Sequence, residues 1–469
     1  MVLTRRAVVG GAIAAALPPA RVGAALPTDD IRVLREAYLA MHPGLYRYAR
    51  PAQVAIRLDA LDRAFQATDD LAARYLALTR FTASVRCGHT YPNFSNQKKA
   101  VAARLFEGRT RLPFHFRWLG MRMVVTRSPD LPRGTEVLAI DGTPARAILA
   151  ALLPLARADG SNDAKRRALL DVQGTEDIET FDVLHPLLFQ TGDRFDLQVR
   201  LPDGRRQQLR LGAIDLSERR AARSPGDPNK NWTLEHRGRT AVMAMDGWAQ
   251  YNSQWDWRGW ISEAFNDMAR RGTTGLVVDL RRNEGGNDCG DEIIARLIDA
   301  PLPGRDVRRR VRFRTAPEPL WLYLDTWDQS FRTLGVGARD GGDGFFDLEP
   351  APDNVIAPKG PRFTGRMLVL TSAQNSSSTF QFAARVREAR LGTLVGGTTG
   401  GNQRGINGGC YFFVRLPGGL EVDLPLVGYF PARRAPDAGI DPDIAVHDSL
   451  ADMVRGRDAA LDRALALLA

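Results

Sequence analysis

The first part of the chain carries apolar residues at the spacing of a helix, and the part that follows carries them at the spacing of a strand. Between residues 29 and 78, apolar side chains recur three or four positions apart, which predicts helices. Residues 112–125 alternate between apolar and polar, and residues 134–143 combine a strand-like run with an Asp-Gly turn. Residues 195–211 predict a hairpin. The helical pattern of residues 145–188 interrupts these strands as an insertion, and whether it acts as a lid stays open.

Strand-like and helix-like runs alternate from residue 240 onward. Strands are predicted over 240–245, 275–280 and 367–370, and helices over 257–270, 291–298 and 380–390. Alternation of this kind is typical of an α/β core with a mostly parallel sheet.

These changes of pattern divide the chain into segments. Residues 1–24 are typical of a targeting segment, 25–108 form a helical segment that ends near a Gly-His-Thr break, and 109–215 form a β-rich domain with the helical insertion. Residues 216–237 are polar and rich in Arg, Ser, Pro and Asn, which predicts a linker. Residues 238–469 form the predicted α/β core. A chain of 469 residues is long enough for two or three domains.

The N-terminal residues and the charge balance indicate where the chain works and what it binds. Arg5 and Arg6 precede an apolar run rich in Ala and Gly, and small residues follow near position 24. This pattern is typical of a twin-arginine export signal and predicts a periplasmic or secreted protein. No later run is apolar over the length of a membrane span. The net charge of +10 (64 Lys and Arg against 54 Asp and Glu) is spread through mixed-charge stretches, so no nucleic-acid partner is expected.

Neither a metal site nor a disulfide framework is indicated. Three cysteines, Cys87, Cys289 and Cys410, leave at least one thiol unpaired, and whether two of them form a disulfide stays open. The six histidines share no short ligand spacing, which argues against a zinc hydrolase. The sequence therefore implies no metal and no organic cofactor.

Four consecutive hydroxyl residues, Ser376 to Thr379, stand between the strand predicted over 367–370 and the helix predicted over 380–390. A strand that turns sharply into a helix leaves free backbone N–H groups at the helix start, where a serine can face a substrate carbonyl. An ordinary helix N-cap also explains Ser and Thr at such a place. The run therefore fits either a nucleophile or a cap.

Two further stretches hold candidate catalytic groups. Gly285 and Gly286 follow the strand predicted over 275–280, and paired glycines there permit positive φ angles that turn backbone N–H groups outward, as in one half of an oxyanion hole. A plain glycine turn is the alternative. His89 lies in a Gly-His-Thr break, which leaves its imidazole accessible as a general base, although most single histidines are structural.

Several motifs occur in a characteristic order along the chain. They are Asp-Leu-Arg-Arg-Asn-Glu-Gly-Gly at 279–286, Asn-Ser-Ser-Ser-Thr-Phe-Gln-Phe-Ala at 375–383, Leu-Val-Gly-Gly-Thr-Thr-Gly-Gly at 394–401 and Gly-Ile-Asp-Pro-Asp-Ile at 439–444. Together they resemble the motifs of the C-terminal-processing and tricorn-core serine proteases. His42-Pro43 and the Gly-His-Thr break resemble features of the tricorn-like, His-containing branch of that family. The stretch 134–142 resembles part of the carboxylate-binding-loop domain called PDZ, here with a long helical insertion.

The resemblance implies a serine peptidase with a crotonase-like ββα arrangement in its mostly parallel core. It also implies a PDZ-like middle domain that selects or gates the substrate chain. The nucleophile would be Ser377 and the general base His89. The oxyanion hole would combine the N–H group of Ser378 with that of Gly285 or Gly286.

The third member of the catalytic triad is less sharply indicated by the resemblance. Asp437 is the nearest acid, displaced by one position from the acid of the family, and Asp423 and Glu421 are alternatives for orienting His89. No lysine follows Lys359, so a Ser–Lys dyad of the kind used by the processing branch is excluded from this region.

The glycine-rich stretch 400–409 lies beside the proposed site in the sequence. It either binds the backbone of a peptide, through Gly400, Gly401 and Asn402, or serves as a connector. Both interpretations stay open.

The sequence thus predicts an exported serine peptidase that hydrolyses a polypeptide or peptide substrate by Ser/His catalysis. Phe380 stands where the family has a Glu, and this difference leaves open a catalytically silent member that only binds peptides. An esterase or amidase that acts on a small periplasmic substrate is the second alternative, because the same triad serves both chemistries. Neither the substrate sequence nor the oligomeric state is indicated.

Overall fold

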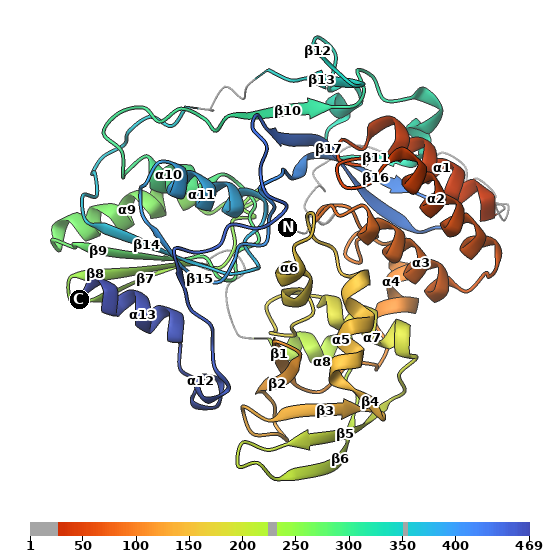
Figure 1. The fold of residues 1–469 in the computed structure, drawn as a ribbon, viewed down its shortest axis with the longest axis horizontal. Coiled ribbons are helices and arrows are strands. Elements are labelled where there is room, and N and C mark those ends of the chain that lie inside the picture. Colours follow the sequence, from red (N-terminus) through yellow and green to blue (C-terminus); the bar gives the residue numbers. More distant parts are fainter. Residues whose placement is uncertain (1–26, 224–231, 350–354) are drawn as a thin grey trace.

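The structure is a computed structural model that describes residues 27–223, 232–349 and 355–469. The export signal expected over residues 1–24 lies outside the described residues. Along the chain, a helical segment is followed by a β-rich middle segment and then by an α/β core (Figure 1). The mixed α/β class predicted from the sequence is confirmed.

Helices make up the N-terminal segment, as its three- and four-residue spacing predicts. They are α1 (Pro27–Met41), α2 (Pro51–Gln66), α3 (Leu71–Ser84) and α4 (Lys99–Phe106). The apolar face of α2 is buried through Val54, Leu58, Leu61 and Phe65. The His-Pro break follows α1 and the segment that carries His89 follows α3, so both histidine motifs lie in connections between helices.

The middle segment is an antiparallel sheet with helices inserted into it. Its strands lie in the order β1 (His115–Leu119), β2 (Arg122–Arg127), β3 (Glu136–Ile140), β5 (Arg194–Arg200) and β6 (Arg206–Gly212), with β4 (Thr143–Pro144) beside β3. The insertion between β4 and β5 contains α5 (Ala145–Leu152), α6 (Asp163–Ala168) and α7 (Thr180–Phe189). Buried residues of α5 and α7 belong to the same hydrophobic cluster as those of α1 to α4, so the insertion joins the middle sheet to the N-terminal helices.

The stretch predicted to be a linker, residues 216–237, holds regular structure at both ends. α8 (Leu216–Ala221) begins it, because Asp215 and Glu218 form a capping box at the start of this helix. β7 (Trp232–Arg237) ends it, and residues 224–231 lie outside the described residues. The polar composition of the stretch hid both of these short elements.

A mostly parallel sheet forms the centre of the α/β core. Its strands lie in the order β18 (Ile444–Ala445), β15 (Thr393–Gly396), β14 (Arg366–Thr371), β9 (Gly275–Asp279), β8 (Thr240–Met245) and β7. Neighbouring strands are parallel except β7 and β8, which form an antiparallel pair. Successive side chains of a strand point to opposite faces, so Val278 faces one helical layer and Val277 faces the other.

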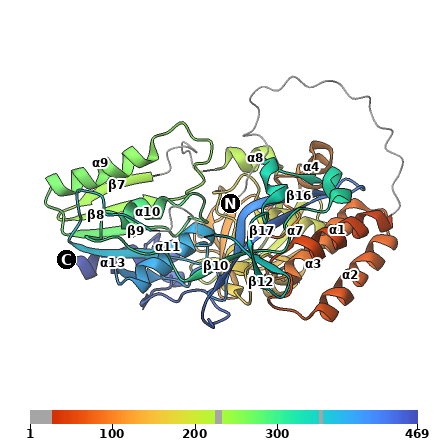
Figure 2. The same ribbon diagram turned by 90° about the horizontal axis from the view of Figure 1, so that it is seen from above.

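Helices cover both faces of this parallel sheet. α9 (Trp257–Arg270), α10 (Cys289–Ile294) and α11 (Ser377–Glu388) pack on one face, and α13 (Ala459–Leu468), which follows α12 (Leu450–Arg455), packs on the other (Figure 1). Seen from above, α9 and α13 lie at the end of the molecule opposite α1 and α2 (Figure 2). α11 begins at Ser377 rather than at the predicted residue 380, so the run of hydroxyl residues forms its first turn. None of the described helices is both long and apolar enough to cross a membrane.

An antiparallel sheet that the sequence pattern did not reveal connects the core to the N-terminal helices. Its strands, in order, are β11 (Leu324–Asp325), β16 (Asn407–Arg415), β17 (Glu421–Pro431), β10 (Val307–Val311), β13 (Phe345–Asp347) and β12 (Arg339–Gly342). Short 3₁₀ helices occur at η2 (Leu153–Leu155), η3 (Glu318–Tyr323) and η4 (Gln329–Thr333). Phe412 of β16 and Leu424 of β17 share a buried cluster with Leu34 and Tyr38 of α1, which brings the segment of His89 to the edge of the core.

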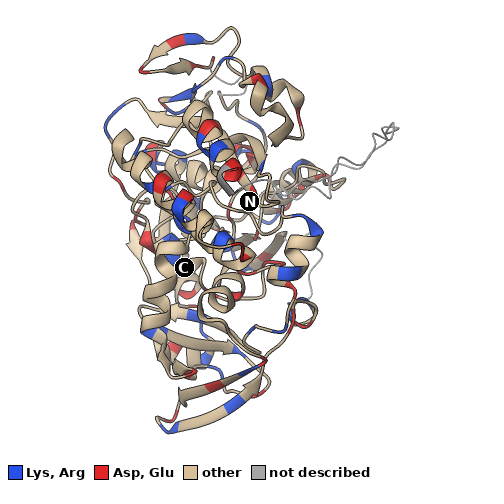
Figure 3. Cartoon of the chain, turned by 90° about the vertical axis from the view of Figure 1, so that its right-hand side faces the viewer, with Lys and Arg blue, Asp and Glu red and all other residues tan. Residues whose placement is uncertain are grey.

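Basic and acidic residues are interleaved along the described chain (Figure 3). Many of them pair: Arg281, for example, lies 2.6 Å from Asp279 and 2.7 Å from Asp458, and so fastens the start of α13 to the end of β9. All three cysteines are free thiols.

Candidate active site

The turn between β14 and α11 holds one serine in an unusual backbone conformation. Ser376 is extended, with φ −129° and ψ −178°, and occupies the N-cap position of α11. Ser377, the next residue, has φ +50°, a left-handed conformation that costs a non-glycine residue about 1–2 kcal/mol. A strained serine on a sharp strand-to-helix turn is the geometry that exposes a nucleophilic hydroxyl.

Two of the three neighbouring hydroxyl groups have structural partners, whereas Ser378 Oγ is buried without a hydrogen-bond partner among the described residues. Ser376 Oγ donates to the carbonyl of Glu284 (3.1 Å), and no side-chain capping bond is formed at this N-cap. Thr379 Oγ1 donates to the carbonyl of Asn283 (3.0 Å). Both groups therefore fasten the serine turn to the glycine-containing loop that follows β9. Ser377 is half-buried, whereas the other three hydroxyl residues of the run are buried.

Gly285 of this loop lies directly against the serine turn, and Gly286 lies against the backbone of Trp248. A Cβ atom on Gly285 would lie 2.9 Å from Cβ of Ser377 and 3.0 Å from the backbone nitrogen of Ser378. The φ angles of Gly285 and Gly286 are +110° and +138°, which side-chain-bearing residues rarely adopt. The contact and the conformation both require glycine at these positions.

Only one of the two glycine N–H groups is left for a ligand. The Gly285 N–H donates to Asn283 Oδ1 at 2.9 Å. Gly286 forms a parallel bridge with Trp248, in which Trp248 N–H donates to the Gly285 carbonyl and Asn287 N–H donates to the Trp248 carbonyl. Within the described residues, the Gly286 N–H donates no hydrogen bond. Gly286 thus joins Ser378, whose N–H lies in the first turn of α11, as an available donor.

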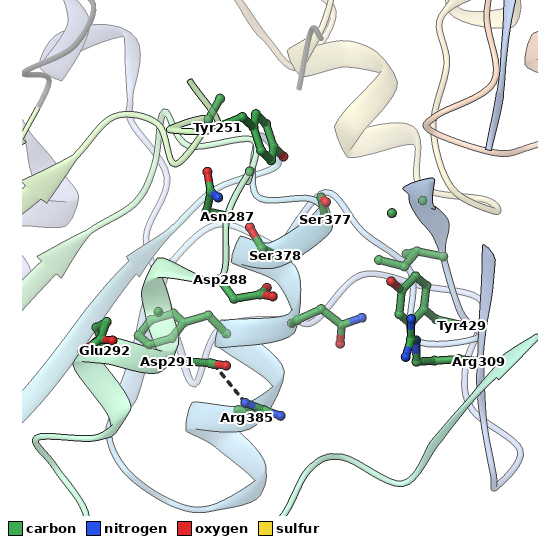
Figure 4. A pocket seen from close by; sticks show the side chains of 18 of the residues that line it. Tyr251, Asn287, Asp288, Asp291, Glu292, Arg309, Ser377, Ser378, Arg385 and Tyr429 are labelled. Carbon is green, nitrogen blue, oxygen red and sulfur yellow. Dashed lines mark hydrogen bonds and ion pairs between the residues drawn. The ribbon is translucent and has the colours of Figure 1, made fainter. Parts of the chain in front are cut away.

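Ser377, Ser378 and Gly286 open onto a cavity of about 1660 Å³. Figure 4 shows the two serines at the start of α11, with Tyr429 and Arg309 on another wall. The cavity has the size of a site that holds several residues of an extended chain, and its walls mix aromatic and charged side chains. Among the described residues, no group of His, Cys, Asp and Glu side chains is arranged to hold a metal ion.

His89 is buried directly behind the wall of this cavity. A Cβ atom on Gly408 would lie 3.9 Å from Cε1 and 4.0 Å from Nε2 of His89, and the His89 and Tyr411 rings are 6.2 Å apart between centroids. Gly408 and Tyr411 both line the cavity. His89 and Ser377 therefore belong to the same region of the molecule, although no hydrogen bond joins them in the described chain.

Burial controls the protonation of His89. It lowers the pKa of the imidazole to about 3, so the ring is neutral at neutral pH and able to accept a proton. Its Nδ1 atom is buried without a hydrogen-bond partner among the described residues. The ring orientation is therefore set by the backbone around it and not by a carboxylate.

The backbone on both sides of His89 is clamped. The Gly88 N–H donates to Asp159 Oδ1 (2.9 Å), and Arg157 Nη1 donates to the Gly88 carbonyl (3.0 Å). On the other side, His42 Nε2 lies 2.8 Å from Thr90 Oγ1. The two histidine motifs predicted from the sequence are thus joined in space.

Asp437 is not in contact with His89. Its carboxylate accepts hydrogen bonds from the Ser161 N–H (2.9 Å) and from Asn402 Nδ2 (2.8 Å), so it fastens two loops to each other. These bonds and the charge of Arg404 outweigh the effect of burial, which alone would raise the pKa, and hold the pKa of Asp437 below its usual value.

The other two candidate acids lie next to the segment that follows His89. Asp423 accepts hydrogen bonds from Nδ2 of Asn93 (2.8 Å) and Nδ2 of Asn96 (3.0 Å). The Glu421 backbone exchanges two hydrogen bonds with the side chain of Gln97. Asp423 and Glu421 therefore attach β17 to residues 93–97 and reach His89 only through the backbone.

Gly400, Gly401 and Asn402 are buried behind the serine turn and are not part of the cavity wall. The N–H groups of the two glycines donate to the carbonyl of Asn375 at 2.6 and 3.0 Å. A Cβ atom on Gly401 would lie 2.4 Å from the ring of Phe380. These residues support the serine turn from the inside, and the end of the glycine-rich stretch becomes the start of β16.

Sequence reasoning missed three charged residues next to the site. Arg157 and Lys165 come from the insertion of the middle segment, and both pair with Glu284, the residue before Gly285. Basic residues are common in the insertion, and nothing in their spacing distinguishes these two.

Residues 239–446 match the model of a family described as peptidase family S41. No curated protein matches the chain.

Among solved structures, mature CPAF complexed with lactacystin is similar to the chain with a TM-score of 0.63 and 13% identity, over 94% of this chain and 98% of that one. Mature CPAF alone gives a TM-score of 0.61 and 14% identity, over 94% and 96%. The photosystem II D1 C-terminal processing protease gives a TM-score of 0.43 and 15% identity, over 93% and 99%. At such identities the CPAF structures establish a shared fold.

Proposed function

Because the chain belongs to peptidase family S41, matched over residues 239–446, and is a serine-type peptidase, we propose that Ser377 is its nucleophile and His89 its general base. The observation that carries the assignment is the left-handed Ser377, with φ +50°, at the start of α11, on the wall of a cavity that Gly286 and Ser378 also line. Polypeptides or peptides are the proposed substrates.

The proposed reaction follows the acyl-enzyme route. Ser377 Oγ attacks the carbonyl carbon of a peptide bond while His89 takes the hydroxyl proton, and the resulting oxyanion accepts hydrogen bonds from Gly286 and Ser378. The C–N bond then breaks as His89 returns the proton to the amine. Water, deprotonated by His89, cleaves the ester in the same way and releases Ser377.

For this proton transfer, we propose that His89 moves to within hydrogen-bond distance of Ser377. Catalytic hydrogen bonds commonly tighten when substrate binds, so their absence in a ligand-free site does not argue against the assignment. Gly408 and Tyr411 separate the imidazole from the cavity, and we propose that a bound peptide shifts them. A histidine as the base is what the resemblance to the tricorn-like, His-containing branch of the family implies.

For the third position of the triad, the contacts favour a role for backbone clamps over a direct carboxylate. Asp437 bonds to Ser161 and Asn402, and we propose that it holds these loops in place. Asp423 is the better candidate for the acid that acts on His89, through the segment of Asn93 that follows the imidazole.

The catalytically silent, peptide-binding alternative was suggested by Phe380, which replaces the Glu of the family. This residue is 2% exposed and packs against Gly401, away from the cavity wall. Its replacement of the family's Glu therefore changes the interior behind the nucleophile turn and leaves the cavity intact.

The finer features of the architecture are also proposals. The antiparallel sheet of β1 to β6 supports a PDZ-like role for the middle segment, and the parallel sheet with α11 supports a crotonase-like core. Export by a twin-arginine signal rests on the sequence of residues 1–24 alone.

The decisive experiment is covalent labelling of the purified full chain with a fluorophosphonate probe. Labelling is expected for the wild type and for Ser378→Ala, and is expected to be lost in Ser377→Ala. Loss in Ser378→Ala with retention in Ser377→Ala would assign the nucleophile to the neighbouring serine. A wild type that does not label would leave the peptide-binding alternative. Turnover of unstructured polypeptides compared with short acyl esters then separates a peptidase from an esterase.

A further inference from the structure

A buried cluster of charged side chains lies beside the proposed catalytic residues, and its cations come from another segment of the chain. The Lys165 side chain is 2% exposed and that of Glu284 is 15% exposed. Lys165 Nζ forms an ion pair with Glu284 Oε1, and it also donates to the backbone carbonyl of Gln374 (3.1 Å). Lys165 belongs to α6 of the insertion, whereas Glu284 and Gln374 belong to the α/β core.

Arg157 is the second cation of this cluster. Its Nη2 lies 3.5 Å from Glu284 Oε2, and its Nη1 donates to the carbonyl of Gly88 (3.0 Å). The guanidinium also stacks over the ring of Tyr91, 4.5 Å from the centroid. Arg157 therefore holds the residues on both sides of His89 and the carboxylate of Glu284 at once.

Each partner of the two cations is within three residues of a proposed catalytic group. Glu284 comes two residues before Gly286, Gln374 comes three residues before Ser377, and Gly88 immediately precedes His89. The oxyanion loop, the nucleophile turn and the segment of the base come from distant parts of the sequence. Lys165 and Arg157 are in hydrogen-bond or ion-pair contact with all three.

The contacts of Lys165 and Arg157 are of a kind that fixes the positions of neighbouring backbone segments. Burial on its own would raise the pKa of Glu284, but the charges of Lys165 and Arg157 hold it well below its usual value, so the carboxylate is ionised. Two of the remaining contacts go to backbone carbonyls, those of Gln374 and Gly88, and not to side chains. Contacts of this kind fix where a segment of backbone lies, which an isolated ion pair does not do.

We propose that Lys165 and Arg157 are positioning residues that assemble the active site, so that the insertion of the middle segment completes it. This inference rests on the proposed roles of Ser377 and His89. In it, the two cations set the separation between the nucleophile, the oxyanion donors and the base. A misplacement of about 1 Å among such groups lowers a rate by about 100-fold.

The test compares variants that remove the contacts with variants that preserve the charge or the stability. Lys165→Met and Arg157→Lys are measured for kcat, KM, the rate of fluorophosphonate labelling and the thermal unfolding midpoint. We expect kcat and the labelling rate to fall about 10- to 100-fold, with KM changed by less than about 3-fold. Arg157→Lys keeps the charge but shortens the reach, so it tests the geometry in a protein that stays folded.

Two further variants separate positioning from stability. Lys165→Met/Glu284→Met removes both charges, so the unfolding midpoint is expected to recover while kcat stays low. Arg219→Met is the matched control, because Arg219 and its partner Asp182 are each 1% exposed and lie away from the cavity. It is expected to lower the unfolding midpoint and leave the labelling rate per folded molecule unchanged.

The inference is overturned if Lys165→Met and Arg157→Lys label at the wild-type rate per folded molecule. It is equally overturned if Arg219→Met loses the same factor, or if the double variant regains full kcat along with its stability. These results require a wild type that labels at Ser377. A wild type that does not label contradicts the proposed nucleophile instead, so the two failures remain distinct.

Discussion

His42 Nε2 lies 2.8 Å from Thr90 Oγ1, which ties the break after α1 to the residue that follows His89. The Gly44 N–H donates to Nδ1 of His42 at 3.1 Å, so the proton of the ring resides on Nε2 and is donated to the threonine hydroxyl. His42 is 1% exposed, and burial lowers its pKa to about 3. The neutral imidazole of His42 thus fixes the position of Thr90, the residue that follows the proposed base His89.

Replacement of His42 is expected to impair catalysis without touching the cavity. In His42→Leu the Thr90 hydroxyl and the Gly44 N–H lose their buried partner, which costs about 1–3 kcal/mol of stability for each unpaired group. We expect kcat to fall about 10-fold, with KM nearly constant, because the segment of His89 becomes less ordered. Steady-state kinetics and thermal unfolding check this. His42→Gln, which can still donate to Thr90, should recover part of the loss, and equal kcat in all three proteins would contradict the role.

The pH dependence of the reaction follows from the protonation of His89. A general base works in its neutral form, and burial lowers the pKa of His89 from its ordinary value to about 3. The fraction of His89 that is neutral therefore stays near one down to about pH 5, two pH units above its pKa. We expect kcat/KM to stay constant from pH 8 to about pH 5, whereas a solvent-exposed histidine would produce a fall near its ordinary pKa of about 6.5.

A pH–rate profile over a range in which the fold is stable checks the expectation. His89→Ala is the accompanying variant, since loss of a general base typically costs about 100- to 10,000-fold. An acidic limb centred near pH 6.5 in the wild type would show that His89 becomes solvated before the proton transfer.

Much of the core was predictable from the sequence because its signals are local. The strands β8, β9 and β14 and the helix α9 follow from apolar runs and periodicity, and the turn that holds Ser377 follows from the strand–hydroxyl–helix order. The clamps on His89 were not predictable. His42, Asp159 and Arg157 meet the residues next to His89 only after the three segments have packed, and no spacing within the sequence encodes that meeting.

The same reason explains why two candidate sites from the sequence make contacts that the sequence did not indicate. Asp437 lies close in sequence to the motif that suggested it, yet its carboxylate is used by Ser161 and Asn402. The stretch that begins at Gly400 looked like a polar loop because glycines dominate it. In the folded chain these glycines allow a close approach to Asn375 and Phe380, which is a packing role that composition does not distinguish from flexibility.

Substitution of Gly285 is expected to damage the oxyanion loop directly. A Cβ atom there would lie 2.9 Å from Cβ of Ser377, and the φ angle of +110° disfavours any side chain. Gly285→Ala should therefore displace the serine turn from the donors and lower the fluorophosphonate labelling rate about 100- to 1000-fold, the cost of losing one oxyanion donor.

The matched control is Gly272→Ala. Gly272 also has a positive φ angle, +62°, but no atom lies within 4 Å of a Cβ built there. It should lose about 1 kcal/mol of stability through backbone strain alone and label at the wild-type rate. Equal labelling by both variants would contradict the proposed position of the oxyanion hole.

Asp423 is expected to make stability depend on pH. Burial raises the pKa of its carboxyl group to about 6, and the hydrogen bonds from Asn93 and Asn96 offset only part of that rise. A carboxyl group whose pKa is higher in the folded state stabilises the fold most when it is protonated. Its contribution is full below about pH 4, where the unfolded chain is protonated too, and is lost as the pH rises through 6. The loss amounts to about 3 kcal/mol at most.

The two acids proposed for the third catalytic position can be separated by paired variants. Asp423→Ala leaves Nδ2 of Asn93 and Nδ2 of Asn96 unpaired beside the segment of His89, so kcat should fall about 10-fold or more. The same variant should also remove the dependence of the unfolding free energy on pH between about 4 and 6.

Asp437→Asn keeps an acceptor for Ser161 and does not touch the imidazole, so its kcat should stay within about 3-fold of the wild type. Steady-state kinetics together with urea unfolding at several pH values measure both effects. If Asp437→Asn instead loses more activity than Asp423→Ala at equal stability, the orienting acid is Asp437, and the loop at residues 160–161 must move aside when a peptide binds.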